Sequence, residues 1–582
     1  MATGRYGAHD LLADTPQSLA QGETDRFTAC SVSMVNRGNT PCKVSIAITT
    51  SANAINDLDY IDKDVEILPA CVLERTGIAI KSGQYITVSS NQARVSAVAY
   101  GVESGATVSV TEIPDVSSGS IPAQFIATSA VSLLNEYDTR PGPSGSVVVF
   151  GNVEAPANPG STGWSNGQIL AYSNTGQFSY GAQIRHSSFN SGEYTARIEA
   201  GTTDSSGNAY FGGRNLHATS GSGSIGLVVG KINGAGAPQW NKYMQDGSYS
   251  TGGFYELQGI DVSQDDGEVY VSSYTNNAPG NTGSNRQVVI KALDSSDGSA
   301  HSNGHVVLAR GSATTQSDGG KIACSPSGHL YCAFMTSNAT PNGSGSMVTL
   351  TKLNPDSAYS EVWSRDSYMV ENNGNQGYNI YDISVAPNND VYMVGGFTST
   401  TPIIVKYDAN GVWQWTRSHE TGPNVYFGNF TISAHSAGVV LNCKISDGTY
   451  EGYAANFDTS GAVTWQYRFD NDYELNHPTV IGDSVYSTDD DSRVHKVPLS
   501  GLTTPQTIPG STVISTGTVT WSNPGTNANT NIQPVRSFTD SATATLIRDT
   551  SYSGPATFTD ANTSYWNVTS IASGSNTVTL LS

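Results

Sequence analysis

The chain has 582 residues, of which 28 are basic and 49 acidic, giving a formal net charge of −21. A surface this acidic repels nucleic-acid phosphates and anionic lipid headgroups, so the composition argues against both as partners. The 61 glycines predict many turns, and apolar residues recur in runs of strand length, so we expect an all-β protein.

The N-terminal residues carry no targeting signal that the sequence makes visible. MATGRYGAHDLLADTPQSLAQ lacks the basic and apolar regions of a signal peptide. No stretch approaches 18 consecutive apolar residues, so no membrane-spanning helix is expected. The composition is nevertheless typical of extracellular proteins. A protein made in a cytoplasm and released by cell lysis, such as a virion component, fits both observations.

Residues 1–115 are expected to form a small β-sandwich. Six runs have the character of strands: RFTACSVSMVN, CKVSIAIT, YIDKDVEIL, VLERTGIAI, QYITVSS and RVSAVAYGVE. In the last run Val95, Ala97 and Ala99 share one face, as in a half-buried sheet. Pro41 and Pro69 stand beside predicted turns, where a missing N–H group costs least.

Three motifs of this region, VNRGNTPCKVSIAI, LPACVLERTGIAIKSGQYITVSS and AVAYGVE, carry a resemblance to a known module. They are similar to a β-sandwich found near the starts of tail-associated structural proteins of marine bacteriophages. That module usually shows a turn of small residues followed by LERTG and a glycine-bearing hairpin, which correspond here to Leu73–Gly77 and Ser82–Gly83. The resemblance implies a virion protein whose N-terminal module serves docking and oligomerisation.

Residues 116–510 repeat one pattern of strand, turn, strand, loop, strand, turn and strand. The apolar centres of the third strands recur at intervals of 40 to 61 residues, at Tyr172, Ile232, Leu293, Leu353, Tyr407, Phe457 and Val497. Four antiparallel strands at this spacing are typical of a β-propeller blade, whose faces are buried only by stacking on other blades. The seven copies therefore predict a closed seven-bladed propeller.

The fifth repeat shows the pattern whole, with strands expected at Ile383–Val385, Val391–Phe397, Ile403–Tyr407 and Val412–Arg417. Val394 and Val405 are expected to face neighbouring blades, and Asp408 to lie in a solvated turn. The first strand of the first blade is expected within QFIATSAVSLL, and the seventh blade lacks an obvious fourth strand. Because propellers often close by letting distant segments share a blade, this irregularity is expected.

The repeats also resemble a named family. DSSGNAYFGG followed by GLVVGKINGAGAPQWNKY is similar to the SBBP repeat of seven-bladed β-propellers. The resemblance covers roughly residues 125–505 and implies the fold. It implies little about function, because propellers serve as enzymes, as binding proteins and as scaffolds.

Residues 511–582 follow the repeats and differ from them. They are polar and rich in β-formers, and Arg536 and Arg548 are their only basic residues. We expect either a small C-terminal β-domain or an arm that reaches a neighbouring subunit.

The sequence contains no recognised catalytic motif, neither His-Glu-x-x-His nor Gly-x-Ser-x-Gly. His301 and His305, in HSNGH, are the closest pair of histidines, and we expect a solvated hairpin there. The acidic runs SQDDGEVY, DNDYE and STDDDSR offer oxygen ligands for Ca²⁺, with Asp470, Asp472 and Glu474 the best candidates, but none matches a full calcium-binding loop. Solvated turns are expected instead, with no catalytic, cofactor-binding or metal-binding residue.

Six cysteines are too few for a disulfide framework, so we expect small buried thiols. Cys324 and Cys332, which flank a predicted hairpin turn, are the one pair considered for a disulfide.

The tryptophans fall into two groups. Trp240, Trp363, Trp413, Trp415 and Trp465 recur in the fourth strands, where we expect packing at the outer rim of the ring in preference to stacking on sugars. Trp164, Trp521 and Trp566 lie outside the repeat register. They are better candidates for contact with another molecule.

Together these features predict a non-enzymatic structural protein of a phage virion, a component of its tail, baseplate or fibre, without cofactors. Its expected partners are other tail proteins and further copies of itself, in threes or sixes by family analogy. Two alternatives stay open: an adhesin that binds glycans of the host surface, and a polysaccharide depolymerase with paired carboxylates in the funnel of the propeller. The copy number, the position on the particle and the host receptor also stay open.

Overall fold

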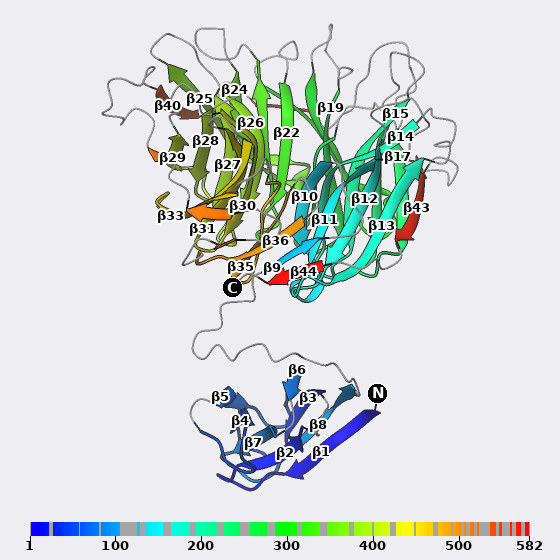
Figure 1. Cartoon of the computed structure of the whole chain (residues 1–582), viewed down its shortest axis with the longest axis vertical. Coiled ribbons are helices and arrows are strands. Elements are labelled where there is room, and N and C mark those ends of the chain that lie inside the picture. The colour runs from blue at the N-terminus through cyan, green and yellow to red at the C-terminus, as the bar shows by residue number, and fades with distance from the viewer. Residues whose placement is uncertain are drawn as a thin grey trace. The chain divides into compact units, whose positions relative to one another are not determined.

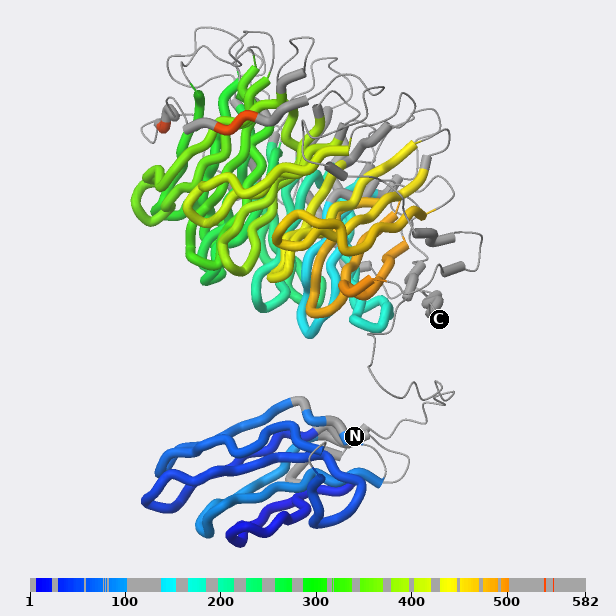
Figure 2. Tube along the Cα trace, turned by 90° about the vertical axis from the view of Figure 1, so that its left-hand side faces the viewer, coloured from blue at the N-terminus to red at the C-terminus, as the bar shows by residue number. Residues whose placement is uncertain are grey.

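The computed structural model describes most of the chain in two compact units, Met1–Gly119 and Ser120–Ser582, which are treated separately below (Figures 1 and 2). The described residues are 2–22, 27–56, 59–80, 83–104, 125–128, 135–154, 165–186, 194–217, 226–244, 257–275, 286–310, 317–337, 346–371, 378–397, 401–419, 426–446, 450–469, 475–489, 493–501, 506–507, 513–516, 521–522, 536–542, 546–549, 559–560, 566–571 and 577–580. Within them the only helices are two short 3₁₀ turns, Pro143–Gly145 and Pro355–Ser357, and neither is long enough to cross a membrane. The protein is all-β.

The first unit is a sandwich of two four-stranded antiparallel sheets. One sheet has the order β1 (Ala2–Asp10), β8 (Val95–Ser104), β3 (Phe27–Asn36) and β6 (Val72–Ile80), and the other has the order β2 (Gln17–Gln21), β7 (Tyr85–Ser90), β4 (Cys42–Thr49) and β5 (Tyr60–Ile67). Val95, Ala97 and Ala99 all point into one apolar core between the sheets, as their alternation predicts. The six expected strands are present, and the sequence analysis missed only β1 and β2.

The second unit contains seven four-stranded antiparallel blades. Blade 1 consists of β10 (Asn135–Pro141), β11 (Val147–Glu154), β12 (Ser165–Tyr172) and β13 (Phe178–His186). Blade 2 consists of β14 (Tyr194–Thr203), β15 (Ala209–His217), β16 (Gly226–Ile232) and β17 (Pro238–Met244). Blade 3 consists of β18 (Leu257–Val262), β19 (Glu268–Thr275), β20 (Gln287–Asp294) and β21 (Ala300–Arg310). Blade 4 consists of β22 (Ser317–Cys324), β23 (Leu330–Thr336), β24 (Met347–Asn354) and β25 (Ser360–Glu371). Blade 5 consists of β26 (Asn379–Val385), β27 (Val391–Phe397), β28 (Thr401–Tyr407) and β29 (Trp413–His419). Blade 6 consists of β30 (Tyr426–His435), β31 (Gly438–Ser446), β32 (Tyr450–Asp458) and β33 (Val463–Phe469). The strands of the fifth blade lie where the sequence predicts them.

Blade 7 closes the ring with a strand from the start of the unit. It consists of β34 (Thr479–Ile481), β35 (Ser484–Thr488), β36 (Arg493–Pro498) and β9 (Phe125–Thr128), with β9 antiparallel to β36. The segment QFIATSAVSLL was expected to hold the first strand of blade 1. That expectation is wrong, because β9 pairs within blade 7 and β10 opens blade 1.

Apolar clusters fill the interface between every pair of neighbouring blades. Six of them join consecutive blades from 1 to 7, and a seventh joins blade 7 back to blade 1 through Val147, Tyr172, Tyr486 and Val494. Val405 is fully buried in the cluster between blades 4 and 5, as expected, and Val394 lies in the cluster between blades 5 and 6. The seven clusters show that the blades form a closed ring, since each blade is covered on both faces.

The strands described within residues 506–580, here called the belt, lie along the outer edges of all seven blades. Its strands are β38 (Val513–Thr516) on blade 6, with β37 (Gln506–Thr507) beyond it, then β39 (Trp521–Ser522) on blade 5, β40 (Arg536–Ala542) on blade 4, β41 (Leu546–Asp549) on blade 3, β42 (Thr559–Asp560) on blade 2, β43 (Trp566–Ile571) on blade 1 and β44 (Thr577–Leu580) on blade 7. The belt visits the blades in the reverse of their chain order, and Figure 1 shows β40, β43 and β44 beside the blades they extend. The segment expected to be a small domain or an arm therefore contributes its strands to the sheets of the blades.

Side chains of the belt also link one blade to the next. Asp540, in the strand added to blade 4, accepts a 2.9 Å hydrogen bond from the hydroxyl of Tyr407 in blade 5. Arg548, in the strand added to blade 3, donates a 2.6 Å hydrogen bond to the carbonyl of Tyr359, which follows β24 in blade 4. The belt thus bridges blades as well as extending them.

Four of the five recurring tryptophans belong to a repeated clasp between blades. In blades 2, 4 and 5 a lysine of the third strand and a tryptophan of the fourth donate to one carbonyl in the turn of the next blade. The pairs are Lys231 and Trp240 on Ser295, Lys352 and Trp363 on Ala409, and Lys406 and Trp415 on Thr459, all between 2.9 and 3.2 Å. Blade 6 keeps the tryptophan alone, with Trp465 on Leu499, and blade 7 keeps the lysine alone, with Lys496 on Asn174.

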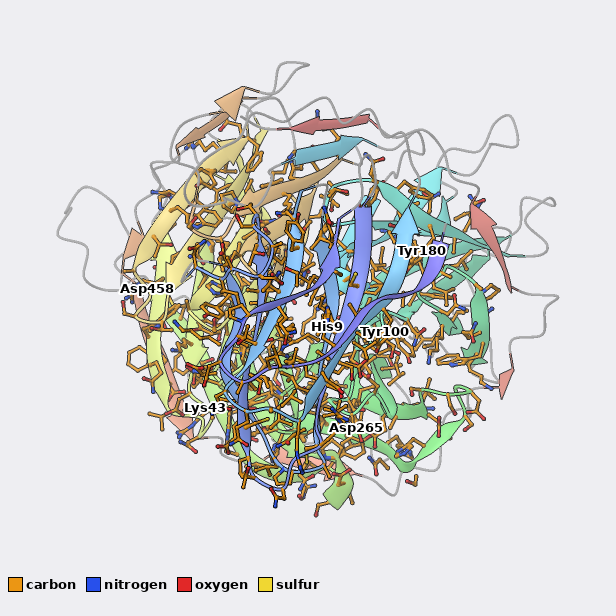
Figure 3. The ribbon with its side chains drawn as sticks, turned by 90° about the horizontal axis from the view of Figure 1, so that it is seen from below. His9, Lys43, Tyr100, Tyr180, Asp265 and Asp458 are labelled. Atoms are coloured by element: carbon orange, nitrogen blue, oxygen red, sulfur yellow. The ribbon has the colours of Figure 1, made fainter. Side chains whose placement is uncertain are left out.

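Four of the five turns that receive a clasp begin with an aspartate or serine whose side chain accepts a hydrogen bond from an N–H group of the turn, and all five end with a glycine. Asp458, which lies at the periphery of the ring in Figure 3, accepts hydrogen bonds from the N–H groups of Ser460 and Ala462. Gly461 follows at φ 80°, a left-handed conformation that favours glycine. A Cβ atom there would lie 2.9 Å from the ring of Trp415, so a larger residue would be disfavoured by this close contact as well as by the φ angle.

We expect Gly461→Ala to destabilise the propeller by about 1–3 kcal/mol more than Gly328→Ala, because only the first adds overpacking to an unfavourable φ. Gly328 is a matched control, since it has a φ of 75° and no atom within 4 Å of its added Cβ. Denaturant unfolding of both variants measures the difference. Equal losses of stability would show that the tryptophan contact adds no restriction at this turn.

Candidate functional site

The first strands of the blades converge on the interior of the ring, and those of blades 1 to 6 each carry a register shift. The shifts fall between Glu136 and Asp138, Ile198 and Ala200, Leu257 and Gly259, Asp318 and Lys321, Ile380 and Asp382, and Gly428 and Thr431. Such bulges bend a strand and redirect its side chains. They occur at the same place in each blade, next to the residues that line a cavity.

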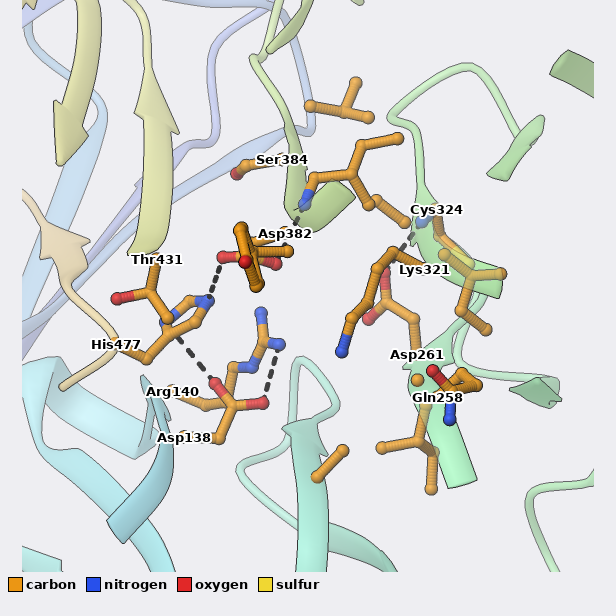
Figure 4. Close-up of a pocket in the computed structure, with 18 of the residues that line it drawn as sticks. Asp138, Arg140, Gln258, Asp261, Lys321, Cys324, Asp382, Ser384, Thr431 and His477 are labelled. Atoms are coloured by element: carbon orange, nitrogen blue, oxygen red, sulfur yellow. Dashed lines mark hydrogen bonds and ion pairs between the residues drawn. The ribbon is translucent and has the colours of Figure 1, made fainter. Parts of the chain in front are cut away.

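This central cavity has a volume of about 210 Å³. Its charged and polar lining comes from six blades and from the segment before β34 of the seventh: Asp138, Arg140, Glu199, Gln258, Asp261, Lys321, Cys324, Asp382, Ser384, Thr431 and His477. Figure 4 shows Asp138, Asp382 and His477 directed toward one another, with Lys321 between them and Asp261. Four carboxylates against two permanent cations make the cavity acidic, like the chain as a whole.

His477 connects three blades at the centre of this site. Its Nδ1 lies 3.3 Å from Oδ1 of Asp138 in blade 1, and its Nε2 lies 3.2 Å from Oδ2 of Asp382 in blade 5 (Figure 4). All three side chains are largely buried, and Arg140 adds a 2.8 Å contact to the other oxygen of Asp138. The cluster therefore ties blades 1, 5 and 7 together across the ring.

A second carboxylate is held on the other side of the cavity. Asp261 accepts hydrogen bonds from the N–H of Cys324 at 2.7 Å and from the hydroxyl of Thr202 at 2.9 Å. These contacts join blades 2, 3 and 4. Lys321 also lines the cavity, between the two acidic clusters in Figure 4.

The electrostatics of the cavity reflect both burial and pairing. Burial lowers the pKa of Arg140, but the carboxylates of Asp138 and Asp261 together outweigh it and hold this pKa above its usual value. Burial raises the pKa of Asp382, but the charge and hydrogen bond of His477 and the N–H of Ile432 outweigh it and hold this pKa below its usual value. Burial raises the pKa of Asp261 in spite of Arg140.

We expect Asp382 to stabilise the fold at neutral pH and to lose that effect in acid. Its pKa is depressed in the fold, so its contribution is present above about pH 4 and is lost as the pH falls through the lower folded value. Asp382→Asn should therefore melt at a lower temperature than the parent at pH 7, with a smaller difference near pH 3. Asp483→Asn, at an exposed turn position, is the control; a difference for Asp382→Asn that is independent of pH would refute this assignment.

Three of the four carboxylates that line the cavity are held by other groups of the protein. Here Asp138, Asp261 and Asp382 are each engaged by cations, by His477 or by N–H and O–H donors of the protein. Among the described residues no group of three His, Cys, Asp or Glu side chains is arranged to hold a metal ion.

The residues singled out from the sequence lie elsewhere. His301 and His305 are part of the long strand β21 and do not form the hairpin turn expected there; Nδ1 of His301 lies 3.5 Å from Glu268. Asp265 accepts hydrogen bonds within its own turn, as expected. Asp470, Asp472 and Glu474 lie outside the described residues.

Asp489 departs from the expectation of a solvated turn. It is buried, and its Oδ2 lies 2.7 Å from Nε of Arg493 and 2.6 Å from Nε2 of His495. Burial raises the pKa of Asp489, but His495 and Arg493 outweigh it and lower the pKa overall. This ion-paired cluster lies in β36 and just before it, beside the closing strand β9.

The structure also shows the state of the cysteines and the positions of the tryptophans that lie outside the repeat register. All six cysteines are free thiols, and Cys324 faces Leu330 in the hairpin where a bridge to Cys332 was considered. Cys30, Cys42, Cys332 and Cys443 are buried, Cys324 is half-buried and Cys71 is exposed. Trp164 lies outside the described residues, and Trp521 and Trp566 begin the belt strands β39 and β43.

The residues of the cavity were not predicted from the sequence, although two of them share a pattern. Asp138 in NEYDTRP and Asp382 in NIYDISV occupy the same place in their first strands, directly after the register shift. An aspartate repeated on strands that face the axis of the ring points to the centre of the molecule. His477 lies outside the strands and offered no such signal.

Strand order and the seven interblade clusters define the second unit as a seven-bladed β-propeller, preceded in the chain by a β-sandwich. No protein-family model matches the chain, and no curated protein sequence matches it.

Solved structures of β-propeller-like proteins resemble the chain at low identity. BamB from Moraxella catarrhalis is 12% identical with a TM-score of 0.32, over 62% of this chain and 83% of BamB. Virginiamycin B lyase from Staphylococcus aureus is 11% identical with a TM-score of 0.34, over 64% of this chain and 98% of the lyase. An ulvan lyase is 8% identical with a TM-score of 0.36, over 65% of this chain and 94% of the enzyme. At these values the likenesses carry no argument about function.

Proposed function

We propose that the protein is a non-enzymatic structural component of a phage virion, in its tail, baseplate or fibre, present there as a homo-oligomer. The N-terminal sandwich attaches it to other tail proteins, and the propeller is the body that the particle displays. The resemblance of residues 1–115 to tail-associated modules first suggests this role.

The C-terminal belt is the observation that carries the proposal. A virion component has to persist outside the cell, yet the cysteines of this chain are free thiols, so no disulfide staples the ring. The belt supplies a non-covalent closure, because it pairs with the outer strand of every blade and covers edges that would otherwise invite aggregation. An enzyme does not need such a closure to build a site, whereas a durable particle component benefits from it.

The sandwich offers a surface suited to docking. Among the described residues, five of the eight exposed large apolar side chains lie on this smaller unit: Leu12, Ile61, Leu68, Val72 and Tyr100. Leu68 lies in the turn that joins β5 and β6, the edge strands of the two sheets, while Val72 begins β6 and Ile61 lies near the start of β5. Exposed apolar groups gathered at open sheet edges are typical of protein–protein contact surfaces.

The test is incorporation into particles. Particles purified from cells that produce the protein should contain the full chain by mass spectrometry, and should lack a variant without residues 1–119. The point variants Leu68→Asp and Val72→Asp should reduce incorporation, whereas Val412→Asp, on an exposed position of the propeller, should not. Normal incorporation of the truncated chain would overturn the docking role, and absence of the full chain from particles would overturn the proposal.

A further inference from the structure

The central cavity contains one cation that the described part of the protein does not pair. Lys321 enters the cavity from β22 of blade 4, and Figure 4 shows its ammonium group between Asp261 and the cluster around His477. Arg140, the other permanent cation of the lining, contacts Asp138 at 2.8 Å. Lys321 has no side-chain hydrogen bond or ion pair with any residue that the structure describes. Its three N–H donors are therefore available to a molecule that enters the cavity.

Two consecutive glycines place Lys321 at the centre of the ring. Gly319 and Gly320 have φ angles of 99° and 28°. They occupy the register shift between Asp318 and Lys321, and a bulge of this kind redirects the side chain that follows it. A Cβ atom on Gly320 would lie 2.8 Å from Cγ1 of Val288 in blade 3, so packing as well as backbone conformation disfavours a larger residue. The fold itself thus sets the direction of Lys321.

A second unused donor comes from the neighbouring blade. Gln258 occupies the register shift between Leu257 and Gly259 in β18 of blade 3, and its side chain lines the same cavity (Figure 4). Its amide also has no hydrogen bond to a described residue. A carboxamide nitrogen donates two hydrogen bonds, so it suits a ligand oxygen. The ammonium of Lys321 and the amide of Gln258 therefore offer donors from two adjacent blades.

The charge and size of the cavity limit the ligand. The four carboxylates of the lining repel anions, and Lys321 is the cation left to attract one. One ammonium balances one carboxylate, whereas a phosphate group, with a charge of about −1.5 to −2, would leave an excess of negative charge among these carboxylates. The volume of about 210 Å³ is smaller than the roughly 300–1,000 Å³ of pockets for drug-sized ligands, so only a small molecule fits.

We propose that the central cavity binds a small monocarboxylate, whose carboxylate oxygens accept hydrogen bonds from Lys321 and Gln258. The ligand lies between blades 3 and 4 on one side and the cluster around His477 on the other. Because it binds the closed ring and not the unfolded chain, it stabilises the propeller. This site gives the ring a function separate from the attachment of the sandwich to other tail proteins.

The test uses the full chain with acetate, lactate and pyruvate as probes, each compared with sodium chloride at equal ionic strength. At least one of them should raise the melting temperature of the propeller and bind saturably in isothermal titration calorimetry. Lys321→Met removes the charge from a side chain of similar shape and should weaken binding by at least about tenfold, the effect of losing one charge-assisted hydrogen bond. Lys321→Arg should retain part of the binding. Lys43→Met, at an exposed position of the sandwich, is the control and should leave binding unchanged.

Three outcomes would overturn the inference: no saturable binding of any of the three carboxylates, binding that Lys321→Met leaves intact, or tighter binding of inorganic phosphate than of the carboxylates. Each shift is measured against the melting temperature of the same variant without ligand, so a change in the stability of the variant itself does not affect the comparison. Lys321→Met should still be incorporated into particles. Failure of the carboxylate site therefore leaves the structural role standing, and failure of incorporation by the full chain counts against the structural role alone.

Discussion

Removal of residues 502–582 should leave a propeller that aggregates and melts well below the intact chain. Each blade would lose the strand paired to its outer edge, and blade 7 would keep β9 but lose β44. The exposed edges are templates for pairing with other molecules. Because the belt also links blades through Tyr407 and Arg548, we expect loss of cooperativity along the whole ring.

A point substitution tests the backbone pairing of the belt without deleting the segment. Thr539→Pro removes a backbone donor from β40 opposite Tyr368 and should detach the belt from blade 4, whereas Thr539→Ala should be nearly neutral. Size-exclusion chromatography and thermal unfolding report both effects. A truncated chain that stays monomeric and melts with the parent would show that the belt is dispensable.

Val405→Asp should unfold the propeller. Val405 is fully buried among side chains of blades 4 and 5, so a carboxylate there would lie in an apolar cluster without a partner. Burying an uncompensated charge costs several kcal/mol or forces a large shift of its pKa. Because each blade covers its neighbours, the damage should spread beyond blade 5. Circular dichroism melts of the full chain should show loss of the propeller transition.

Asp408→Ala, three residues away, is the matched comparison. The sequence predicts a solvated turn with almost no effect, but the carboxylate accepts three hydrogen bonds, from Asn410, Val412 and Gln414. We therefore expect a measurable loss of about 1–2 kcal/mol, typical of a lost cap, and no global unfolding. Equal and small melting shifts for Val405→Asp and Asp408→Ala would contradict the register of blade 5.

The sequence predicts the repeating part of this fold well because the repeats impose one pattern many times. Each blade must bury both faces, so short and nearly continuous apolar strands recur along the chain, and the four strands of the fifth blade lie where they are predicted. The strands that were not predicted pair with strands that are distant from them in the sequence. β9 joins β36 across more than three hundred residues, and the belt strands of two to seven residues are too short to show a period.

The central cavity escaped prediction for a related reason. Its residues come from all seven blades and meet only after the ring closes. The bulges that turn Asp138 and Asp382 toward His477 depend on pairing with the second strands, which a single-sequence pattern does not reveal. Trp413 was grouped with the packing tryptophans, but it is exposed, and its Nε1 donates to Thr416 of its own strand and not to the next blade.

A cryo-EM map of particles purified from the cells that produce this protein tests the central claim most directly. The account predicts density for several symmetry-related copies on the tail, baseplate or fibre, each attached through its N-terminal sandwich and each displaying a seven-bladed ring with a fifth strand on every blade. Particles that lack this density, or copies held through the propeller with the sandwich free, would contradict it.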